Sequence, residues 1–302
     1  MQHDFYRPYN YQRLRGGFDE RGNLVAWSTH VVTTPIAATN LYTGQVETPA
    51  ALRDPETIAA LEWFGGDVAP YAVGSFRLDY APAESVVPRS WWRGVASSHT
   101  TFAKECFVDE LAHAAGRDPV EFRLQLLDRS PDAARLRAVL SLAADKAGWG
   151  RRMPARHGLG VACRAGQTMS AQIAEVAVDD AGAVRVVRIV SAVDCGIAVS
   201  PDGVKAMIEG GIDFGLTAVL LGEITIRDGR VAQSNFHDFP LLRFHQAPEV
   251  DVHIVPSVAN PSGVGELATM LVGPAVANAV FAATGVRARR LPIDPRALRP
   301  ET

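Results

Sequence analysis

The feature that most constrains the fold is a change in hydrophobic periodicity near residue 157. Upstream of it, apolar residues recur at helical spacing; downstream, β-branched residues come in short runs at 173–178 and 184–193. The sequence Asp179-Asp180-Ala181-Gly182 separates these two runs and predicts a hairpin. Helical and strand segments are grouped rather than strictly alternating, which predicts an α+β or mixed α/β fold.

The first region, residues 1–155, is expected to combine one hairpin with several helices. Turn residues at 16–22 lie between β-rich runs at 11–14 and 24–32, which predicts two paired strands. Capping residues combined with helical apolar spacing predict helices after Asp54-Pro55, at about 101–115, from Asp118 onward and at about 132–147.

The second region, residues 156–302, is expected to hold most of the strands. Besides the 173–193 hairpin, the patterns predict a long apolar helix at about 201–221, two strands flanking Asp228-Gly229, a strand at 250–255 and a helix at 274–284 capped by Gly285.

Composition excludes several classes of partner. The 302 residues carry a net charge of −3 and no block of Lys or Arg, which argues against nucleic acid or an anionic membrane as the main partner. No uninterrupted apolar run of membrane-spanning length occurs, so no membrane span is expected. A small-molecule substrate and other proteins are therefore the expected binding partners. Localisation stays open between bacterial cytoplasm and periplasm.

The cysteines and histidines do not indicate a metal site. Cys106, Cys163 and Cys195 are far apart, and the eight histidines show no spacing typical of metal ligands. We therefore expect no zinc or iron–sulfur site ligated by this chain, and we interpret the cysteines as buried thiols.

The segment Pro261-Ser262-Gly263-Val264-Gly265-Glu266-Leu267-Ala268 carries the most chemical information. Its glycines allow a sharp turn, and Glu266 precedes an apolar run. Desolvation by apolar neighbours makes a carboxylate a stronger base, as general-base catalysis near neutral pH requires. A surface acid near a helix N-terminus is the alternative interpretation. The segment also matches a dinucleotide-binding fingerprint, but the prolines separate it from the preceding strand.

Several ordered blocks resemble the large subunits of molybdenum hydroxylases of the xanthine dehydrogenase and aldehyde oxidase type, especially the isoquinoline 1-oxidoreductase beta-subunit group. The resemblance extends over nearly the whole chain, from about residue 3 to 292. The blocks that carry it are Trp92-Arg93-Gly94-Val95, 102–112, Asp118-Pro119-Val120-Glu121-Phe122-Arg123, 192–196 with Glu209-Gly210-Gly211, Gly263-Val264-Gly265-Glu266 and 273–281.

The resemblance implies a molybdenum–molybdopterin cofactor, in some members the cytosine dinucleotide form, with Glu266 as the base that activates the attacking oxygen. It also implies three groups of cofactor-binding residues. The first is the loop that lies over the molybdenum, the second is the Cys195-Gly196 segment, and the third immediately precedes Glu266. These residues are Arg93, Gly94, Val95, Ala96 and Ser97, and then Cys195, Gly196, Gly263, Val264 and Gly265. An ordinary Ser cap and plain core packing are the alternative interpretations of the 93–97 and 195–196 segments.

Two departures from the family pattern weaken the resemblance. At Met207, relatives usually carry a glutamine that hydrogen-bonds the cofactor, and a thioether cannot replace an amide donor. The upstream, glycine-rich half of the subunit is also missing, and the family holds its cofactor between both halves. The implied partners are therefore a chain that supplies the N-terminal half and a small [2Fe–2S] subunit.

Three functions follow from these patterns. The first is the C-terminal half of a molybdenum hydroxylase large subunit, which hydroxylates an aldehyde or an N-heteroaromatic carbon with water as the oxygen source. The second is a non-catalytic remnant that does not bind the cofactor alone, and the third is a nicotinamide enzyme. The substrate is not identified; Arg93 and Phe239 are candidate pocket residues.

Overall fold

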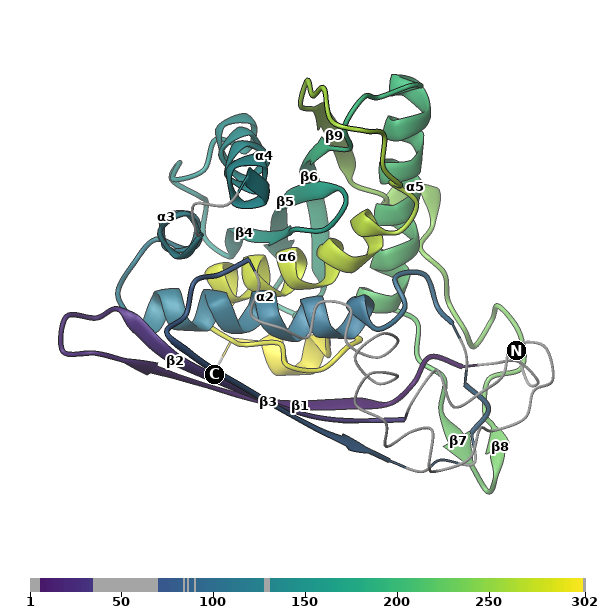
Figure 1. The fold of residues 1–302 in the computed structure, drawn as a ribbon. Coiled ribbons are helices and arrows are strands. Elements are labelled where there is room, and N and C mark those ends of the chain that lie inside the picture. The colour runs from purple at the N-terminus through teal and green to yellow at the C-terminus, as the bar shows by residue number, and fades with distance from the viewer. Residues whose placement is uncertain are drawn as a thin grey trace.

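The computed structural model describes residues 6–34, 70–83, 85, 87–89, 91–127 and 131–300. The helix predicted after Asp54-Pro55 lies outside these residues. Within them, the expected α+β fold is confirmed: a three-stranded sheet and a four-stranded sheet have helices between and around them, and a short two-stranded sheet is separate (Figure 1).

The predicted N-terminal hairpin is confirmed as part of a small three-stranded sheet. Strands β1 (Asn10–Phe18) and β2 (Leu24–Thr33) pair antiparallel, and β3 (Ser75–Pro82) joins β2 in parallel. The turn between β1 and β2 is held by the Asp19 carboxylate, which accepts hydrogen bonds from the backbone amides of Arg21 and Asn23.

The second sheet is larger and lies in the C-terminal region. Strands β4 (His157–Arg164), β5 (Met169–Val178) and β6 (Val184–Asp194) form an antiparallel meander. The predicted hairpin is therefore confirmed as β5 and β6. Strand β9 (Glu249–Ile254) adds to β6 in parallel, close to the predicted 250–255.

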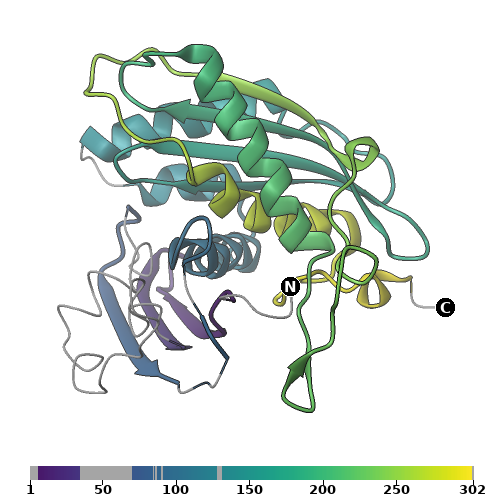
Figure 2. The ribbon, with the colours of Figure 1, turned by 90° about the vertical axis from the view of Figure 1, so that its right-hand side faces the viewer.

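The helices form layers between and around the sheets. The layers begin with the three-stranded sheet and continue with α2, α6, the four-stranded sheet and α4. Helix α5 packs beside α6 and β9 (Figure 1 and Figure 2). The layers form because apolar side chains of each element are buried against its neighbours. The helices are α2 (Ser97–Ala114), α3 (Pro119–Leu126), α4 (Pro131–Ala147), α5 (Pro201–Leu220) and α6 (Leu267–Thr284). Near Asp228-Gly229, the two predicted strands are the short pair β7 (Ile226–Arg227) and β8 (Arg230–Val231).

Two helix starts differ from the sequence prediction. α2 begins at Ser97 rather than near residue 101, so its first turn is polar and buried. α6 begins at Leu267 and runs through Pro274, where the sequence predicted the helix to start. The apolar residues before Pro274 are buried among neighbouring elements, and this packing outweighs the hydrogen bond that proline cannot donate. Gly285 caps α6 with a φ of 76°, as predicted.

Helix α6 is the one helix among the described residues that is long and apolar enough for a membrane span. Of its 18 residues, 78% are buried inside the protein. It contacts β4, β5, α2 and α5, so its apolar surface is covered by the fold as a core helix. This helix positions the candidate site because Glu266 immediately precedes it.

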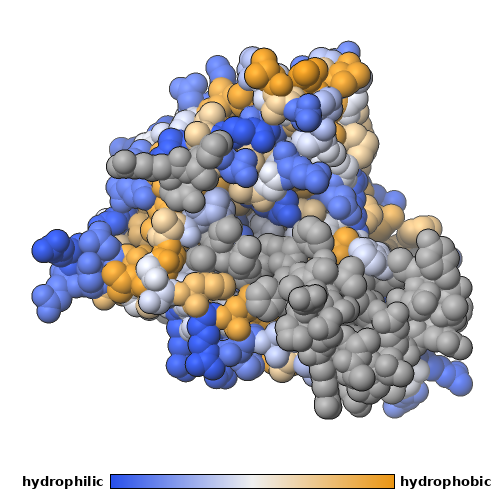
Figure 3. Space-filling model, in the orientation of Figure 1, coloured by the Kyte–Doolittle hydropathy of each residue, from blue (hydrophilic) through white to orange (hydrophobic). Residues whose placement is uncertain are grey.

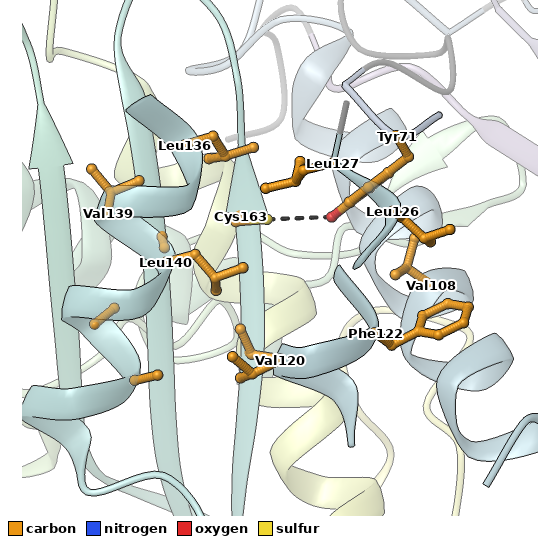
Figure 4. Packing of buried hydrophobic residues seen from close by; sticks show 14 of the residues in the cluster. Tyr71, Val108, Val120, Phe122, Leu126, Leu127, Leu136, Val139, Leu140 and Cys163 are labelled. Atoms are coloured by element: carbon orange, nitrogen blue, oxygen red, sulfur yellow. Dashed lines mark hydrogen bonds between the residues drawn. The ribbon is translucent and has the colours of Figure 1, made fainter. Parts of the chain in front are cut away.

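Two hydrophobic cores lie on the two faces of the large sheet. The first joins α2, α3 and α4 to residues of β4 such as Val161 and Cys163, so it extends across residue 155. Figure 4 shows Tyr71 pointing into this core, with its hydroxyl 3.3 Å from the Cys163 sulfur. Burial raises the pKa of the Cys163 thiol to about 12, which fits the expected buried thiol.

A buried ion pair fixes α2 against α3 and β4. The Glu105 carboxylate accepts hydrogen bonds from Arg123 Nε at 3.0 Å, the Tyr71 hydroxyl at 2.8 Å and the backbone amide of Cys163 at 3.0 Å. Glu105 and Arg123 are both fully buried. This ion pair joins two of the blocks that resemble the family, because residues 102–112 contain Glu105 and residues 118–123 contain Arg123.

Candidate active site

The loop before α2 and the loop before α6 meet at Glu266. The backbone amide of Gly94 donates a hydrogen bond to Glu266 Oε1 at 3.0 Å, and Arg93 Nε donates to the Gly265 carbonyl oxygen at 2.6 Å. The structure therefore brings together predicted site residues that lie far apart in the sequence.

The conformation of the first loop depends on Gly94. Its φ is +99°, and the following Val95 also has a positive φ of 47°. A hydrogen bond from the Val95 amide to the Trp92 carbonyl, 2.7 Å long, closes this turn. A β-carbon on Gly94 would lie 3.0 Å from Met270 Cγ of α6. The turn therefore combines a left-handed backbone with close contact to α6, and it directs the Gly94 amide at Glu266.

Glu266 itself lies at the surface of this chain. It occupies the residue before α6, its side chain makes no capping hydrogen bond, and it is exposed. The expectation that apolar neighbours enclose it is therefore wrong for this chain. The physical reason is the early helix start: Leu267, Ala268 and Met270 belong to α6 and turn into the core, while the residue before them stays outside.

Helix α5 forms the third side of the site. Arg93 Nη1 lies 3.5 Å from the Gly210 carbonyl oxygen, and Nη2 lies 3.4 Å from that of Met207. The terminal methyl of Met207 lies 3.7 Å from where a Gly265 β-carbon would be. Residue 207, where relatives are expected to carry glutamine, is therefore adjacent to the residue that precedes Glu266.

Close approach of α5 and α6 requires glycine at position 211. A β-carbon there would lie 2.9 Å from Ala268 Cβ and 3.4 Å from Arg93 Nη2. The Gly211 carbonyl accepts a hydrogen bond from Thr269 Oγ1 at 2.9 Å, which ties the two helices. The Glu209-Gly210-Gly211 block thus leaves room for the Arg93 side chain.

Cys195 and Gly196 are joined to the loop before α6 through the backbone. Ser262 donates two hydrogen bonds to the Cys195 carbonyl, from its amide at 2.9 Å and from its hydroxyl at 3.1 Å. The Cys195 thiol is buried, and burial raises its pKa. The Cys195-Gly196 segment therefore contacts the loop before α6 through its backbone and not through the Cys195 sulfur. Val264, in the same loop, is half-buried.

Sequence reasoning missed a buried polar run at the start of α2. Five consecutive polar residues, Ser97-Ser98-His99-Thr100-Thr101, are all buried. Neither ring nitrogen of His99 has a hydrogen-bond partner among the described residues. Burial, with a smaller contribution from the charge on Arg7, lowers the pKa of His99 to about 3. The signal in the sequence was the run of five consecutive polar residues directly before the apolar positions of this helix.

The polar run lies where the electrostatics of a helix favour negative charge. It forms the N-terminal turn of the 18-residue α2, where the helix dipole favours negative charge. Arg164 Nη2 lies 3.4 Å from the Ser97 hydroxyl and adds a positive charge. The Ser98 and Thr100 hydroxyls already donate to the Val95 and Ala96 carbonyls. The helix dipole and the Arg164 charge are therefore the features of this turn that favour an anionic group.

The structure does not bring Phe239 to Arg93. The Phe239 ring lies near Gly222, beyond the C-terminal end of α5, whereas Arg93 contacts Gly210 in the middle of that helix. Among the described residues, no group of three His, Cys, Asp or Glu side chains could hold a metal ion. A hollow of about 450 Å³ is lined by β1–β3 residues such as Arg13, His30 and Arg77 and contains none of the predicted site residues.

Exposed apolar side chains gather beside the Cys195-Gly196 segment. Ile197, Val199 and Val258 are 51%, 82% and 97% exposed, and the Ile197 amide bonds to the Ala259 carbonyl at 3.0 Å. Figure 3 shows hydrophobic atoms at the upper end of the molecule, over α5 and the loop that follows β9. We call Ile197, Val199 and Val258 the upper apolar patch. Large exposed apolar groups of this kind are typical of interaction surfaces.

Comparison with known proteins identifies a family. A family model described as a molybdopterin cofactor-binding domain matches residues 132–248, which include Met207 but not Glu266. The membrane-bound aldehyde dehydrogenase (pyrroloquinoline-quinone) of Gluconacetobacter polyoxogenes is 35% identical over 98% of this chain and 40% of the relative. Isoquinoline 1-oxidoreductase subunit beta of Brevundimonas diminuta is 37% identical over 77% of this chain and 30% of the relative.

A solved structure agrees at the level of the fold. Quinoline 2-oxidoreductase from Pseudomonas putida 86 superposes with a TM-score of 0.77, over 95% of this chain and 61% of that protein, at 14% sequence identity. The present chain spans less than half the length of the two curated relatives.

Proposed function

Because this chain belongs to the molybdopterin-binding large subunits of the molybdenum hydroxylases and spans part of such a subunit, we propose that it carries the catalytic glutamate of a multi-subunit oxidoreductase. The proposed reaction is hydroxylation of an aldehyde or an N-heteroaromatic carbon, with water as the source of oxygen. The observation that carries the proposal is the hydrogen bond between the Gly94 amide and Glu266, which joins the two family-like loops at one carboxylate.

Glu266 is the proposed general base. The Gly94 amide holds Oε1, and Oε2 makes no hydrogen bond with another described residue, so it is available to accept a proton. A single well-placed base contributes about 10²–10⁴ in rate.

The proposed cofactor is molybdenum–molybdopterin, in its cytosine dinucleotide form. When bound, it supplies the two-electron redox chemistry. The residues that would hold it are the backbone of the 93–97 loop, the Cys195-Gly196 peptide and the 263–265 turn, together with the buried polar run at the start of α2. The proposed dinucleotide form rests on the resemblance to the family.

The proposed partners are a chain that supplies the upstream half of the subunit and a small [2Fe–2S] subunit that carries electrons away. Both regions of this chain, 1–155 and 156–302, border the site, because one supplies Arg93 and the other Glu266. The upper apolar patch supports a partner on that side of the molecule.

A second candidate function is a half-subunit that folds but does not bind the cofactor. Met207 favours it, because a thioether stands beside Gly265 at the position where an amide donor is expected. The name of one relative also carries pyrroloquinoline quinone, a different redox cofactor.

Metal and cofactor analysis of the purified complex distinguishes these possibilities. The chain is co-expressed with the upstream half and the iron–sulfur subunit, and molybdenum, iron and quinone are measured together. Molybdenum close to one equivalent of the complex supports the hydroxylase. Iron without molybdenum supports the cofactor-free half-subunit, and bound quinone without molybdenum contradicts the proposed cofactor.

A further inference from the structure

The Arg93 side chain donates its hydrogen bonds to backbone carbonyl groups. Its Nε, Nη1 and Nη2 atoms point at the carbonyl oxygens of Gly265, Gly210 and Met207, at 2.6, 3.5 and 3.4 Å. Its guanidinium carbon lies 5.8 Å from the centre of the Phe214 ring, also on α5. A guanidinium donates hydrogen bonds and accepts none, so these contacts engage each of its nitrogen atoms. The side chain therefore bridges α5 and the loop before α6.

The shortest of these contacts acts directly on Glu266. The Gly265 carbonyl belongs to the peptide group that enters Glu266, so Arg93 Nε fixes the backbone just before the base. The next residue, Gly94, holds the carboxylate through its amide. Two consecutive residues thus hold Glu266 at its backbone and at its carboxylate. The two α5 carbonyls anchor Arg93 on the opposite side.

We infer that Arg93 is a positioning residue for Glu266 and contacts neither cofactor nor substrate through its side chain. This inference rests on the proposed function, because it takes Glu266 as the base. Lysine cannot reproduce the arrangement, since its single ammonium group cannot reach three carbonyls in the plane that a guanidinium spans. A displacement of the base by about 1 Å is enough to reduce a catalytic rate on the order of 10²-fold.

The test uses Arg93→Lys and Arg93→Ala in the assembled complex. Arg289→Lys is the matched control, because Arg289 is 69% exposed and pairs only with Glu110 among the described residues. We expect kcat to fall by roughly 10–100-fold in Arg93→Ala and by less in Arg93→Lys, with KM and molybdenum content unchanged. We also expect faster hydrogen exchange in the 262–268 peptide. The control should match the wild type in all four measurements.

A second background separates positioning from general damage. In a Glu266→Gln enzyme, the base is already absent, so Arg93→Ala should cause no further loss of turnover. Equal fold-losses in both backgrounds would overturn the inference. So would a rise in KM at constant kcat, which indicates a substrate contact, or a loss of molybdenum with unchanged exchange at 262–268, which indicates a cofactor contact.

Failure of the proposed function gives a different result. If Glu266→Gln keeps full turnover, Glu266 is not the base and the catalytic part of the inference fails with it. Hydrogen exchange then still tests the contact itself: faster exchange at 262–268 in Arg93→Ala supports the bridge, and unchanged exchange removes it.

Discussion

The backbone amide of Gly94 and the carboxylate of Glu266 are 3.0 Å apart although their positions in the chain differ by 172. Both belong to segments that immediately precede an 18-residue helix, α2 in one case and α6 in the other. Because α2 and α6 pack against each other, their N-terminal ends bring the two loops together. The site is therefore a product of helix packing, and its parts can be tested separately.

Replacement of Glu266 by Gln should abolish most turnover without loss of cofactor. The amide keeps the shape and the hydrogen bond from Gly94 but cannot take a proton at neutral pH. We expect kcat to fall by about 10²–10⁴ at unchanged molybdenum content in the assembled complex. Unchanged turnover would remove Glu266 from the mechanism.

Replacement of Gly94 by Ala should strain the turn and displace the amide that binds Glu266. An alanine would need a φ of +99° and would place its β-carbon 3.0 Å from Met270 Cγ. We expect a loss of about 1–3 kcal/mol in the free energy of unfolding, measured by denaturant titration, and a clear loss of turnover. Gly229→Ala is the control, because Gly229 has a φ of +73° but no neighbouring atom within 4 Å. It should cost stability alone; equal turnover losses in the two variants would contradict this prediction.

Replacement of Met207 by Gln should increase molybdenum occupancy. The change adds an amide donor beside Gly265, where a thioether now lies. Co-expressed complexes of the wild type, Met207→Gln and Met207→Leu are compared by metal analysis. We expect a gain for Gln alone. An equal gain for Leu would show that side-chain shape, and not the amide, controls occupancy.

Truncation of Arg123 should destabilise the whole chain. Arg123→Leu leaves the buried Glu105 carboxylate without its cation, which costs about 3–5 kcal/mol in the free energy of unfolding. The exposed pair of Arg290 and Glu223 provides the control, and Arg290→Leu should cost less than about 1 kcal/mol. Similar costs in the two variants would mean that the buried pair contributes little to holding α2 in place.

The stability of the chain should depend on His99 in mildly acidic solution. Its pKa is lowered by burial to about 3, whereas an unfolded histidine titrates near its ordinary value of 6.5. Between these two values the unfolded state binds more protons, so the free energy of unfolding rises with pH from about 3 and levels off above about 6.5. Acidification through this window therefore destabilises the fold.

The measurement is the free energy of unfolding between pH 7 and pH 4. His99→Gln should weaken the decline by removing the histidine that titrates only on unfolding. His245→Gln is the control for replacement of a histidine, because that side chain is exposed. An unaltered slope in His99→Gln would show that other groups cause the acid sensitivity.

The sequence alone determined the local elements and the family. Turn residues between β-rich runs correctly predicted the hairpins of β1 with β2 and of β5 with β6, because turn chemistry and side-chain alternation are local properties. The sequence also correctly predicted the N-terminal cap of α3, where the Asp118 carboxylate accepts hydrogen bonds from the amides of Val120 and Glu121. The resemblance singled out the two loops that meet at the site.

The tertiary structure decided where these parts lie and what they contact. No local pattern showed that α6 continues through Pro274, because burial against other elements overrides the cost of a proline inside a helix. Nor could spacing show that the Arg93 side chain turns toward backbone carbonyls or that Glu266 stays at the surface. These features depend on distances between segments far apart in the chain, which only the packing of α2, α5 and α6 sets.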